Sequence, residues 1–272
     1  MRVDFWNIGK KIALQGEGMS GKEIRMSRFF SRGKPVVVAI DHGNYFGPIE
    51  GLIDLKETVS KLSNVDGILM TPFIVSHVKQ VFYGKSSPSM ILRVNWTTSL
   101  CHPWKYQEAH TRLVMEPMDA LARGADAVLA ALTLHSGSEK IDAENVKVFT
   151  KIARKAEQAG IPLIGEVIPL VPPAEREFLH DRVRDIVRIA WELGADLIKT
   201  LYTGKDFHEI VSGVPIPVFA LGGEKTNTEE GALDLARSAL SAGAKGVVFG
   251  RNVFQAKDPA KFVELLQEVV KS

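Results

Sequence analysis

The sequence predicts an α/β protein built around a (β/α)8 barrel, the TIM-barrel fold. Three observations predict it: a length of 272 residues, a phrase that recurs along the chain, and eight short apolar segments at fairly regular intervals. A single barrel domain commonly runs to ~250 residues. A doubly wound open sheet could also contain eight strands, but the recurring phrase favours the barrel.

The recurring phrase joins an amphipathic helical segment, a residue suited to the left-handed turn that ends a helix, and a short apolar strand. Its four copies are LSNVDGILM (62–70), ARGADAVLA (122–130), ELGADLIKT (192–200) and SAGAKGVVFG (241–250). Helix, glycine stop and buried strand form the αβ half of a βαβ unit. Repetition of this half is what a barrel of parallel strands requires.

Four further apolar segments complete the set of expected strands: PVVVAI (35–40), MILRV (90–94), IPLIGEVI (161–168) and IPVFAL (216–221). The eight strands are expected to begin near residues 36, 66, 90, 126, 161, 196, 216 and 245. Several are apolar throughout, as parallel strands covered on both faces should be. We therefore expect residues 35–272 to form the barrel. Residues 1–34 would form a short N-terminal extension, in which SGKEIRMSRFF (20–30) predicts a helix that could cap the barrel bottom.

Composition and charge narrow the function classes. Hydrophobic residues make up 45% of the chain and charged residues 24%, as in a soluble globular protein. The net charge of +2 is too small to indicate nucleic acid or an anionic membrane as a partner. Cys101 is the only cysteine, so no intramolecular disulfide can form and nothing suggests secretion. Because the chain also lacks a signal-peptide pattern and a run long enough to span a bilayer, we expect a cytoplasmic protein.

The sixth expected strand, in GADLIKTLYTG (194–204), contains a lysine among apolar residues. In a barrel, the chemistry collects where the strands end. If Leu197, Lys199 and Leu201 point into the barrel, desolvation disfavours the charged amine and lowers the pKa of Lys199. A neutral amine attacks a ketone to form an imine, whose iminium form lets an adjacent carbon–carbon bond break or form. Alternatively, Lys199 belongs to the loop and extends to water.

The first expected strand ends in DHGNYFGP (41–48). The carboxylate of Asp41 could act as a base, bind a substrate hydroxyl, or cap the next helix. His42 could assist proton transfer or bond to a neighbouring carbonyl. Gly43 lets the backbone approach a ligand closely, although glycines are also common in ordinary turns.

The seventh and eighth expected strands end in GGEK (222–225) and GRNVFQ (250–255). Barrels often bind phosphate with backbone N–H groups from the loops after these two strands. Gly222, Gly223 and Gly250 offer such amides, and Arg251 adds a guanidinium group. Together, the two motifs favour a phosphorylated substrate.

On these residues, the sequence resembles the archaeal-type class I aldolases, a family that includes fructose-bisphosphate aldolases, aminodideoxyheptulosonate synthases and the thiolase that processes phosphorylated autoinducer-2. The resemblance covers nearly the whole barrel and is densest in VVVAIDHGNYFGPIEGLIDL and in ELGADLIKTLYTG, GGEKTNT and GRNVFQ. It implies that Lys199 is the Schiff-base residue and Asp41 a base or substrate ligand. It implies phosphate binding by Gly222, Gly223, Gly250 and Arg251. It also implies a homo-oligomer, since family members are often decamers of stacked pentamers.

The expected activity is that of a lyase which forms a Schiff base between Lys199 and a phosphorylated ketose or keto compound. This chemistry requires no metal and no organic cofactor, and the seven histidines show no pair at helical metal-binding spacing. Two alternatives stay open. One is acyl transfer from a phosphorylated diketone to coenzyme A, as in the thiolase branch, and the other is a non-catalytic barrel that binds a sugar phosphate.

One position departs from the family. Its aldolases place a tyrosine on the fifth strand as proton donor and acceptor, and here that position holds Ile168, which cannot carry a proton. Glu166 points the same way by strand alternation. Beside Lys199 it could have a raised pKa and act as the proton shuttle, or it could form a structural ion pair that keeps the amine charged. Tyr202 is a further candidate, although its parity points it away from Lys199.

A second motif, GEGMSGKE (16–23), nearly fits the phosphate-loop pattern of nucleotide-binding proteins. Its last position holds Glu23, where a hydroxyl should bind magnesium, and a carboxylate there would repel phosphate. We therefore expect a flexible glycine-rich arm at this place, not a nucleotide site.

Overall fold

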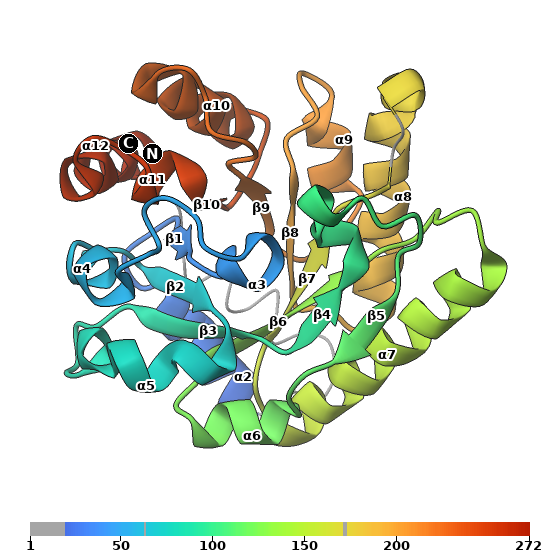
Figure 1. The fold of residues 1–272 in the computed structure, drawn as a ribbon, viewed down its shortest axis with the longest axis horizontal. Helices are drawn as coiled ribbons and strands as arrows, with labels where there is room; N and C mark the ends of the chain where they lie inside the picture. The colour runs from blue at the N-terminus through green and yellow to red at the C-terminus, as the bar shows by residue number, and fades with distance from the viewer. Residues whose placement is uncertain (1–19, 63, 171–172) are drawn as a thin grey trace.

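The computed structural model describes residues 20–62, 64–170 and 173–272. In this part of the chain, eight parallel strands close into a barrel in the order β1-β10-β9-β8-β7-β6-β3-β2 (Figure 1). The strands are β1 (Val36–Ala39), β2 (Gly67–Met70), β3 (Ser89–Arg93), β6 (Ala127–Leu132), β7 (Leu163–Val167), β8 (Leu197–Leu201), β9 (Val218–Leu221) and β10 (Gly246–Phe249). Each begins within two residues of its expected position, so the predicted fold class is confirmed.

Helices surround the barrel (Figure 1). The α-helices are α2 (Ser20–Phe29), α3 (Gly43–Phe46), α4 (Leu55–Ser60), α5 (Val75–Val78), α6 (Pro117–Ala122), α7 (Glu139–Ala159), α8 (Leu179–Glu192), α9 (Phe207–Ser212), α10 (Glu229–Ser241), α11 (Arg251–Phe254) and α12 (Pro259–Lys271). Short 3-10 turns lie at Pro72–Ile74, Lys79–Phe82, Thr98–Leu100, His102–Trp104 and Pro173–Phe178. None of the helices in the described ranges is both long enough and apolar enough to cross a membrane.

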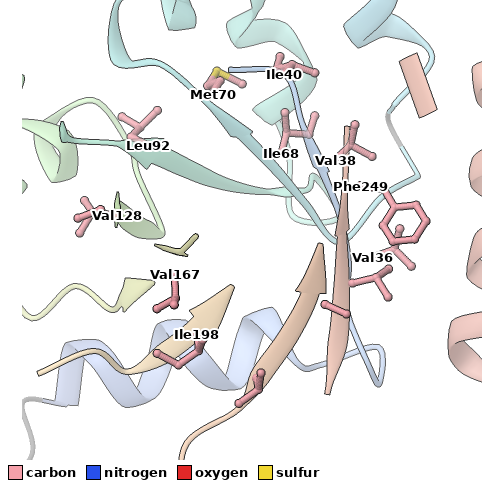
Figure 2. Close-up of a cluster of buried hydrophobic side chains, with 14 of the residues drawn as sticks. Val36, Val38, Ile40, Ile68, Met70, Leu92, Val128, Val167, Ile198 and Phe249 are labelled. Atoms are coloured by element: carbon pink, nitrogen blue, oxygen red, sulfur yellow. The ribbon is translucent and has the colours of Figure 1, made fainter. Parts of the chain in front are cut away.

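Strand alternation divides the buried side chains into two layers. One set points outward and packs under the helices; Figure 2 labels Val36, Val38, Ile68, Leu92, Val128, Val167 and Ile198 among them. The other set fills the inside of the barrel: Val37, Ala39, Leu69, Ile91, Ala127, Leu129, Ile164, Leu197, Phe219 and Val248. Because the period along a strand is two residues, a residue two positions beyond an inward residue also points into the barrel.

Helix α2 closes the bottom of the barrel, as the sequence predicted for this segment. Its Met26 and Phe29 join the cluster inside the barrel, and the ring of Phe29 lies 5.7 Å from that of Phe219. Lys22 forms ion pairs with Asp196, at 3.0 Å, and with Glu157. Residues 16–19 of the glycine-rich motif lie outside the described residues. Lys22, the lysine of that motif, pairs with two carboxylates. These negative charges do not favour phosphate binding at the motif.

The recurring phrase also ties neighbouring strands together at the bottom of the barrel. Three of its four copies have an aspartate just before or at the start of the strand: Asp66, Asp126 and Asp196. Their carboxylates accept hydrogen bonds of 2.8–2.9 Å from the backbone N–H groups of Val36, Met90 and Leu163, which lie in the first two residues of the preceding barrel strands. The aspartates thus satisfy backbone donors at the strand entrances, where an unpaired N–H would be costly.

One element was not predicted. Strands β4 (Asn95–Thr97) and β5 (Thr111–Leu113) form a short antiparallel hairpin between β3 and α6. Its base is held by the side chain of Asn95, which donates to Ala131 O at 2.8 Å and accepts from Ala131 N at 2.9 Å. The hairpin is also linked to helix α3, because Trp96 Nε1 donates to Asn44 O at 3.2 Å. The hairpin therefore lies beside the helix that directly follows Asp41 and His42.

Candidate active site

Four charged side chains enter the barrel at the ends of four strands. Asp41 follows β1, Arg93 ends β3, Glu166 lies on β7 and Lys199 on β8. Each stands two residues beyond a side chain of the inner layer, namely Ala39, Ile91, Ile164 or Leu197. All four residues are at most 6% exposed. The prediction that Lys199 faces the barrel interior is confirmed, and the alternative that it extends to water is excluded.

The four side chains form one chain of ion pairs. Lys199 Nζ lies 2.5 Å from Glu166 Oε1, in line with the β7–β8 register that places these two residues side by side. Arg93 Nη2 lies 2.6 Å from Glu166 Oε2, and Arg93 Nε donates to Asp41 Oδ2 at 2.6 Å. Strand β2 separates Arg93 from Asp41, and β6 separates it from Glu166. The contacts of Arg93 therefore run across the barrel interior.

The two carboxylates of this cluster are held ionised. Burial raises the pKa of Asp41, but the charges of Arg93 and Lys199 outweigh burial and bring the pKa down to about 2. Burial likewise raises the pKa of Glu166, and the same two cations lower it below its usual range. The raised pKa expected for Glu166 is therefore wrong for the substrate-free protein, because Arg93, which the sequence argument did not include, adds a second positive charge.

Lys199 and Glu166 form an ion pair, which is one of the two alternatives that the sequence analysis gave for Glu166. The two side chains lie 2.5 Å apart and are both buried. The same contact places a proton acceptor on the nucleophile. A buried pair of this kind costs desolvation energy on both sides and adds little to stability by itself.

Asp41 does not cap the following helix. Its carboxylate is used by Arg93, and the first residue before helix α3, His42, makes no side-chain capping bond. Asp41 Oδ1 lies 3.6 Å from His42 Nδ1. Burial lowers the pKa of His42 to about 4, against the opposing pull of Asp41, so the imidazole is neutral at pH 7.

His42 also explains why residue 250 is a glycine. A Cβ added at Gly250 would lie 2.3 Å from His42 Cε1, so any side chain there would displace the ring. The imidazole packs edge-on against Phe254 at 5.2 Å. The loops after β1 and β10 are thus in direct contact. At Gly43, by contrast, an added Cβ would meet open space, so no close backbone contact within the protein requires that glycine.

The loops after β9 and β10 are joined by Asn252, a residue that the sequence argument did not single out. Asn252 Nδ2 donates to Gly222 O at 3.0 Å and to Glu224 O at 3.1 Å. Arg251 Nη2 donates to Gly223 O at 3.1 Å. The residues expected to bind phosphate therefore do come together at one edge of the barrel.

The free amide expected at Gly222 is, however, wrong. Gly222 N–H donates to Val248 O at 3.1 Å and so prolongs the β9–β10 pairing. A Cβ at this position would lie 2.9 Å from the ring of Phe249, and this close packing requires a glycine. Gly223 has φ +66° and open space at its Cβ position, which leaves its backbone accessible to a ligand.

The position of the family tyrosine and the further candidate Tyr202 both lie outside the ion-pair cluster. Ile168 is half-buried just after β7, where the family tyrosine would stand. Tyr202 is also half-buried and packs its ring edge-on against Phe207 at 5.4 Å. Within the described part of the chain, neither residue forms a hydrogen bond with the charged side chains.

Most buried polar atoms without a hydrogen-bond partner belong to this end of the barrel. Of eight such side-chain atoms in the described part of the chain, five are His42 Nδ1, Tyr45 Oη, Arg93 Nη1, Glu166 Oε2 and Arg251 Nε. Glu166 Oε2 still has the charge of Arg93 beside it. Unsatisfied buried polar atoms are costly and rare in native proteins, so their concentration here indicates a place where a ligand supplies the missing partners.

The fold and the site together define a class of protein. A barrel with a buried amine, a proton acceptor on that amine and a basic loop pair at its strand ends has the groups that imine chemistry on an anionic substrate requires. The chain matches the DeoC/LacD family of aldolases over residues 35–256, and it belongs to this family.

Individual relatives agree with this assignment. An uncharacterized aldolase of Saccharolobus solfataricus is 36% identical over 93% of this chain and 95% of its own length. The 3-hydroxy-5-phosphonooxypentane-2,4-dione thiolase of Escherichia coli is 30% identical over 92% of this chain and 82% of its own length. A structure of an archaeal fructose-1,6-bisphosphate aldolase, with its catalytic lysine bound to the carbinolamine intermediate, superposes with a TM-score of 0.75 at 28% identity, covering 91% of this chain and 100% of that one. The predicted family and enzyme class are confirmed.

Proposed function

We propose that this chain is a class I aldolase in which Lys199 forms an imine with a phosphorylated ketose or keto compound, so that a carbon–carbon bond is cleaved or formed. The observation that carries the proposal is the buried contact of 2.5 Å between Lys199 Nζ and Glu166 Oε1 at the strand ends. It supplies a nucleophile and a proton acceptor in one place. Membership of the aldolase family supports the same class of reaction.

Imine formation requires an uncharged amine and a hydroxyl that leaves as water. Glu166 takes one proton from the Lys199 ammonium along their hydrogen bond, and the neutral amine adds to the ketone carbon. A proton then passes from the attached nitrogen to the former carbonyl oxygen, which gives the carbinolamine. The protonated Glu166 then returns that proton to the hydroxyl of the carbinolamine, which leaves as water while the C=N bond forms. Because the pKa of Glu166 is lowered, the neutral amine is a transient species, and the iminium regains a carboxylate counter-ion.

Cleavage requires a base at the hydroxyl of the departing carbon. The iminium withdraws the electron pair of the neighbouring carbon–carbon bond while the base takes the hydroxyl proton, which releases an aldehyde and leaves an enamine. Asp41 suits this task, since it is ionised and held in place by Arg93 at 2.6 Å. The same proton is then delivered to the enamine carbon, and hydrolysis of the imine frees Lys199. None of these steps calls for a metal or an organic cofactor.

We further propose that the substrate phosphate binds at the edge formed by Gly223, Gly250 and Arg251. The contact of Arg251 with Gly223 O joins the two loops, and Arg251 Nε has no partner among the described residues. Gly222 would act by shaping the loop, since its own amide is used in the sheet. His42 and Gly43 would border this subsite through the contact of His42 with Gly250. A phosphate here would be bound by fixed donors and one guanidinium group.

Borohydride trapping tests the proposal. Wild-type protein would be incubated with fructose 1,6-bisphosphate, dihydroxyacetone phosphate and further phosphorylated ketoses, reduced with borohydride, and digested for peptide mass analysis. We expect a reduced adduct on Lys199. Lys199→Ala should lose the adduct and lower turnover by at least ~10³-fold. Lys245→Ala, at an exposed lysine at the opposite end of the barrel, is the matched control and should retain both. Unchanged turnover of Lys199→Ala would end the proposal.

Acyl transfer to coenzyme A is the second candidate function. Two observations favour keeping it: the position of the family tyrosine holds Ile168, and the thiolase of Escherichia coli is 30% identical to this chain. The test is direct. Incubation with a phosphorylated diketone and coenzyme A would consume the thiol if this reaction is catalysed, whereas an aldolase would leave the thiol unchanged.

We also propose that the protein is a cytoplasmic homo-oligomer. Large apolar side chains on the surface support the oligomer, among them Phe73 at 62% and Met118 at 55% exposure, since a second copy would cover them. Sedimentation analysis should show a species larger than one chain of 29.9 kDa, and a monomer at micromolar concentration would contradict the proposal. Cell fractionation would test the compartment.

A further inference from the structure

Tyr45 lies in helix α3, four residues beyond Asp41, and its side chain has a feature that packing does not explain. The residue is 4% exposed. Its hydroxyl is buried and has no hydrogen-bond partner among the residues that the structure describes. The side chain of Asn44 comes close to the hydroxyl without the geometry of a hydrogen bond. A buried hydroxyl without a partner is costly, and a phenylalanine would fill the same space without that cost.

The ring of Tyr45 forms part of the wall of the active site. The guanidinium carbon of Arg93 lies 5.3 Å from the centre of the ring, within range of a cation–π interaction. The same guanidinium group contacts Asp41 and Glu166. The backbone N–H of Tyr45 donates to His42 O at 3.0 Å, so the turn that carries His42 also fixes Tyr45. The Tyr45 ring therefore packs against Arg93, the residue that pairs with both carboxylates of the site.

A second donor in the same group is also unused. Arg93 Nη1 is buried and lacks a hydrogen-bond partner in the described ranges. Two buried donors that remain unsatisfied, on side chains in cation–π contact, are suited to an oxygen of a ligand. Burial raises the pKa of Tyr45 well above its usual range, although Arg93 opposes the shift. The phenol therefore keeps its proton and acts as a donor.

We propose that the Tyr45 hydroxyl, together with Arg93 Nη1, donates a hydrogen bond to the substrate oxygen on the carbon that departs in cleavage or is attacked in condensation. That oxygen is the one whose proton Asp41 exchanges, and Asp41 is bound to the same arginine. Negative charge develops on the oxygen as the carbon–carbon bond breaks or forms, so preorganised donors stabilise the transition state more than the ground state. The inference rests on the proposed function and adds a catalytic residue to it.

Tyr45→Phe tests the inference because it removes one oxygen and keeps the ring over Arg93. With the phosphorylated ketose that traps best on the wild-type protein, we expect kcat for cleavage to fall by about 10²–10³-fold. The reduced adduct on Lys199 should still form, since imine formation does not use this hydroxyl. Tyr83→Phe, which alters a tyrosine that is 65% exposed, is the matched control and should keep wild-type turnover.

Thermal unfolding separates this role from a structural one. Removal of an unpaired buried hydroxyl should leave the melting temperature unchanged or raise it by about 1–4 °C. A lower melting temperature together with lost activity would mean that the hydroxyl supports the fold, and would overturn the inference. An adduct on Lys199 with unchanged turnover in Tyr45→Phe would overturn the inference alone. Absence of the adduct from the wild-type protein would overturn the proposed function first.

Discussion

The two ends of the barrel use charged residues in opposite ways. At the bottom, Lys22 and Arg32 lie at the edge of the barrel, with side chains that are 13% and 43% exposed. They pair with Asp196 and Asp66, which also accept backbone N–H groups. At the opposite end, where the strands end, four charged side chains that are at most 7% exposed meet inside the barrel. Two of their polar atoms, Arg93 Nη1 and Glu166 Oε2, have no hydrogen-bond partner in the described part of the chain.

The pKa values of the buried carboxyl groups also differ between the two ends of the barrel. Burial raises the pKa of Asp126 and of Asp196 at the bottom, and nearby cations reverse only part of that shift. At the top, Arg93 and Lys199 outweigh burial, so the pKa values of Asp41 and Glu166 are lowered. Charges at the bottom complete backbone hydrogen bonding, whereas charges at the opposite end pair with one another inside the barrel. Because a buried ion pair adds little to stability, we expect the top to serve chemistry more than folding.

Glu166→Gln should produce the largest effect. The amide is similar in size but cannot accept a proton from the Lys199 ammonium, so the rate of adduct formation should fall by about 10²–10⁴-fold. Single-turnover borohydride trapping measures that rate. Glu157→Gln is the matched control, because Glu157 pairs with a lysine at the bottom and its side chain is 53% exposed. A wild-type trapping rate in Glu166→Gln would show that Glu166 is a structural partner and nothing more.

The second-largest effect is expected for Arg93→Met, on the free energy of unfolding. It leaves Asp41 and Glu166 buried without the cation between them, and breaking a buried pair costs about 3–5 kcal/mol. Arg32→Met at the bottom should cost less than about 1 kcal/mol, because its side chain is 43% exposed and Asp66 keeps the contact with Lys271. Urea unfolding of the two variants compares the ends directly. Equal losses would contradict the distinction between them.

At acid pH, the free energy of unfolding should depend on the protonation of Asp41. Its pKa in the folded protein is about 2, below the ordinary value of 3.8, so its contribution is present above about pH 4 and is lost as the pH falls towards 2. The two values correspond to about 2 kcal/mol. Asp126 and Asp196, with raised pKa values, act in the opposite sense. Asp41→Asn should therefore lose less free energy of unfolding than the wild type between pH 5 and pH 2, and parallel curves would refute this.

The contrast between the ends also explains what the sequence could predict. The eight strands and their inward parity were predictable because apolar runs and glycine stops are local signals. The hairpin of β4 and β5 was not, since its strands have three residues each and are held by Asn95, whose partner Ala131 is distant in sequence. Short strands that depend on such contacts have no periodic pattern of their own.

The site was predictable only in part for a related reason. A lysine in an apolar strand was visible, and Arg93 in MILRV carried the same signal of a charge at an inward position. The partners of Arg93 could not be read from the sequence, because they lie across the barrel on β1 and β7, strands that do not neighbour β3. Without that arginine, the direction of the Glu166 pKa shift came out wrong. The amide of Gly222 was misjudged because the point where strand pairing ends is not a local property.

The smallest effect is expected at the bottom, for Lys22→Met. Asp196 would lose its cation but keep the bond from the Leu163 backbone, so the stability loss should be about 1 kcal/mol, and turnover should not change. Pairing with Asp196 and Glu157 outweighs burial and raises the pKa of Lys22 above 10.5, so its contribution is complete below that pH and is lost as the pH rises beyond it. The difference in unfolding free energy between wild type and variant should therefore stay constant from pH 7 to 10 and shrink above pH 10.5. Reduced turnover in Lys22→Met would show that the two ends of the barrel are coupled. It would contradict the interpretation that charges at the bottom serve only the fold.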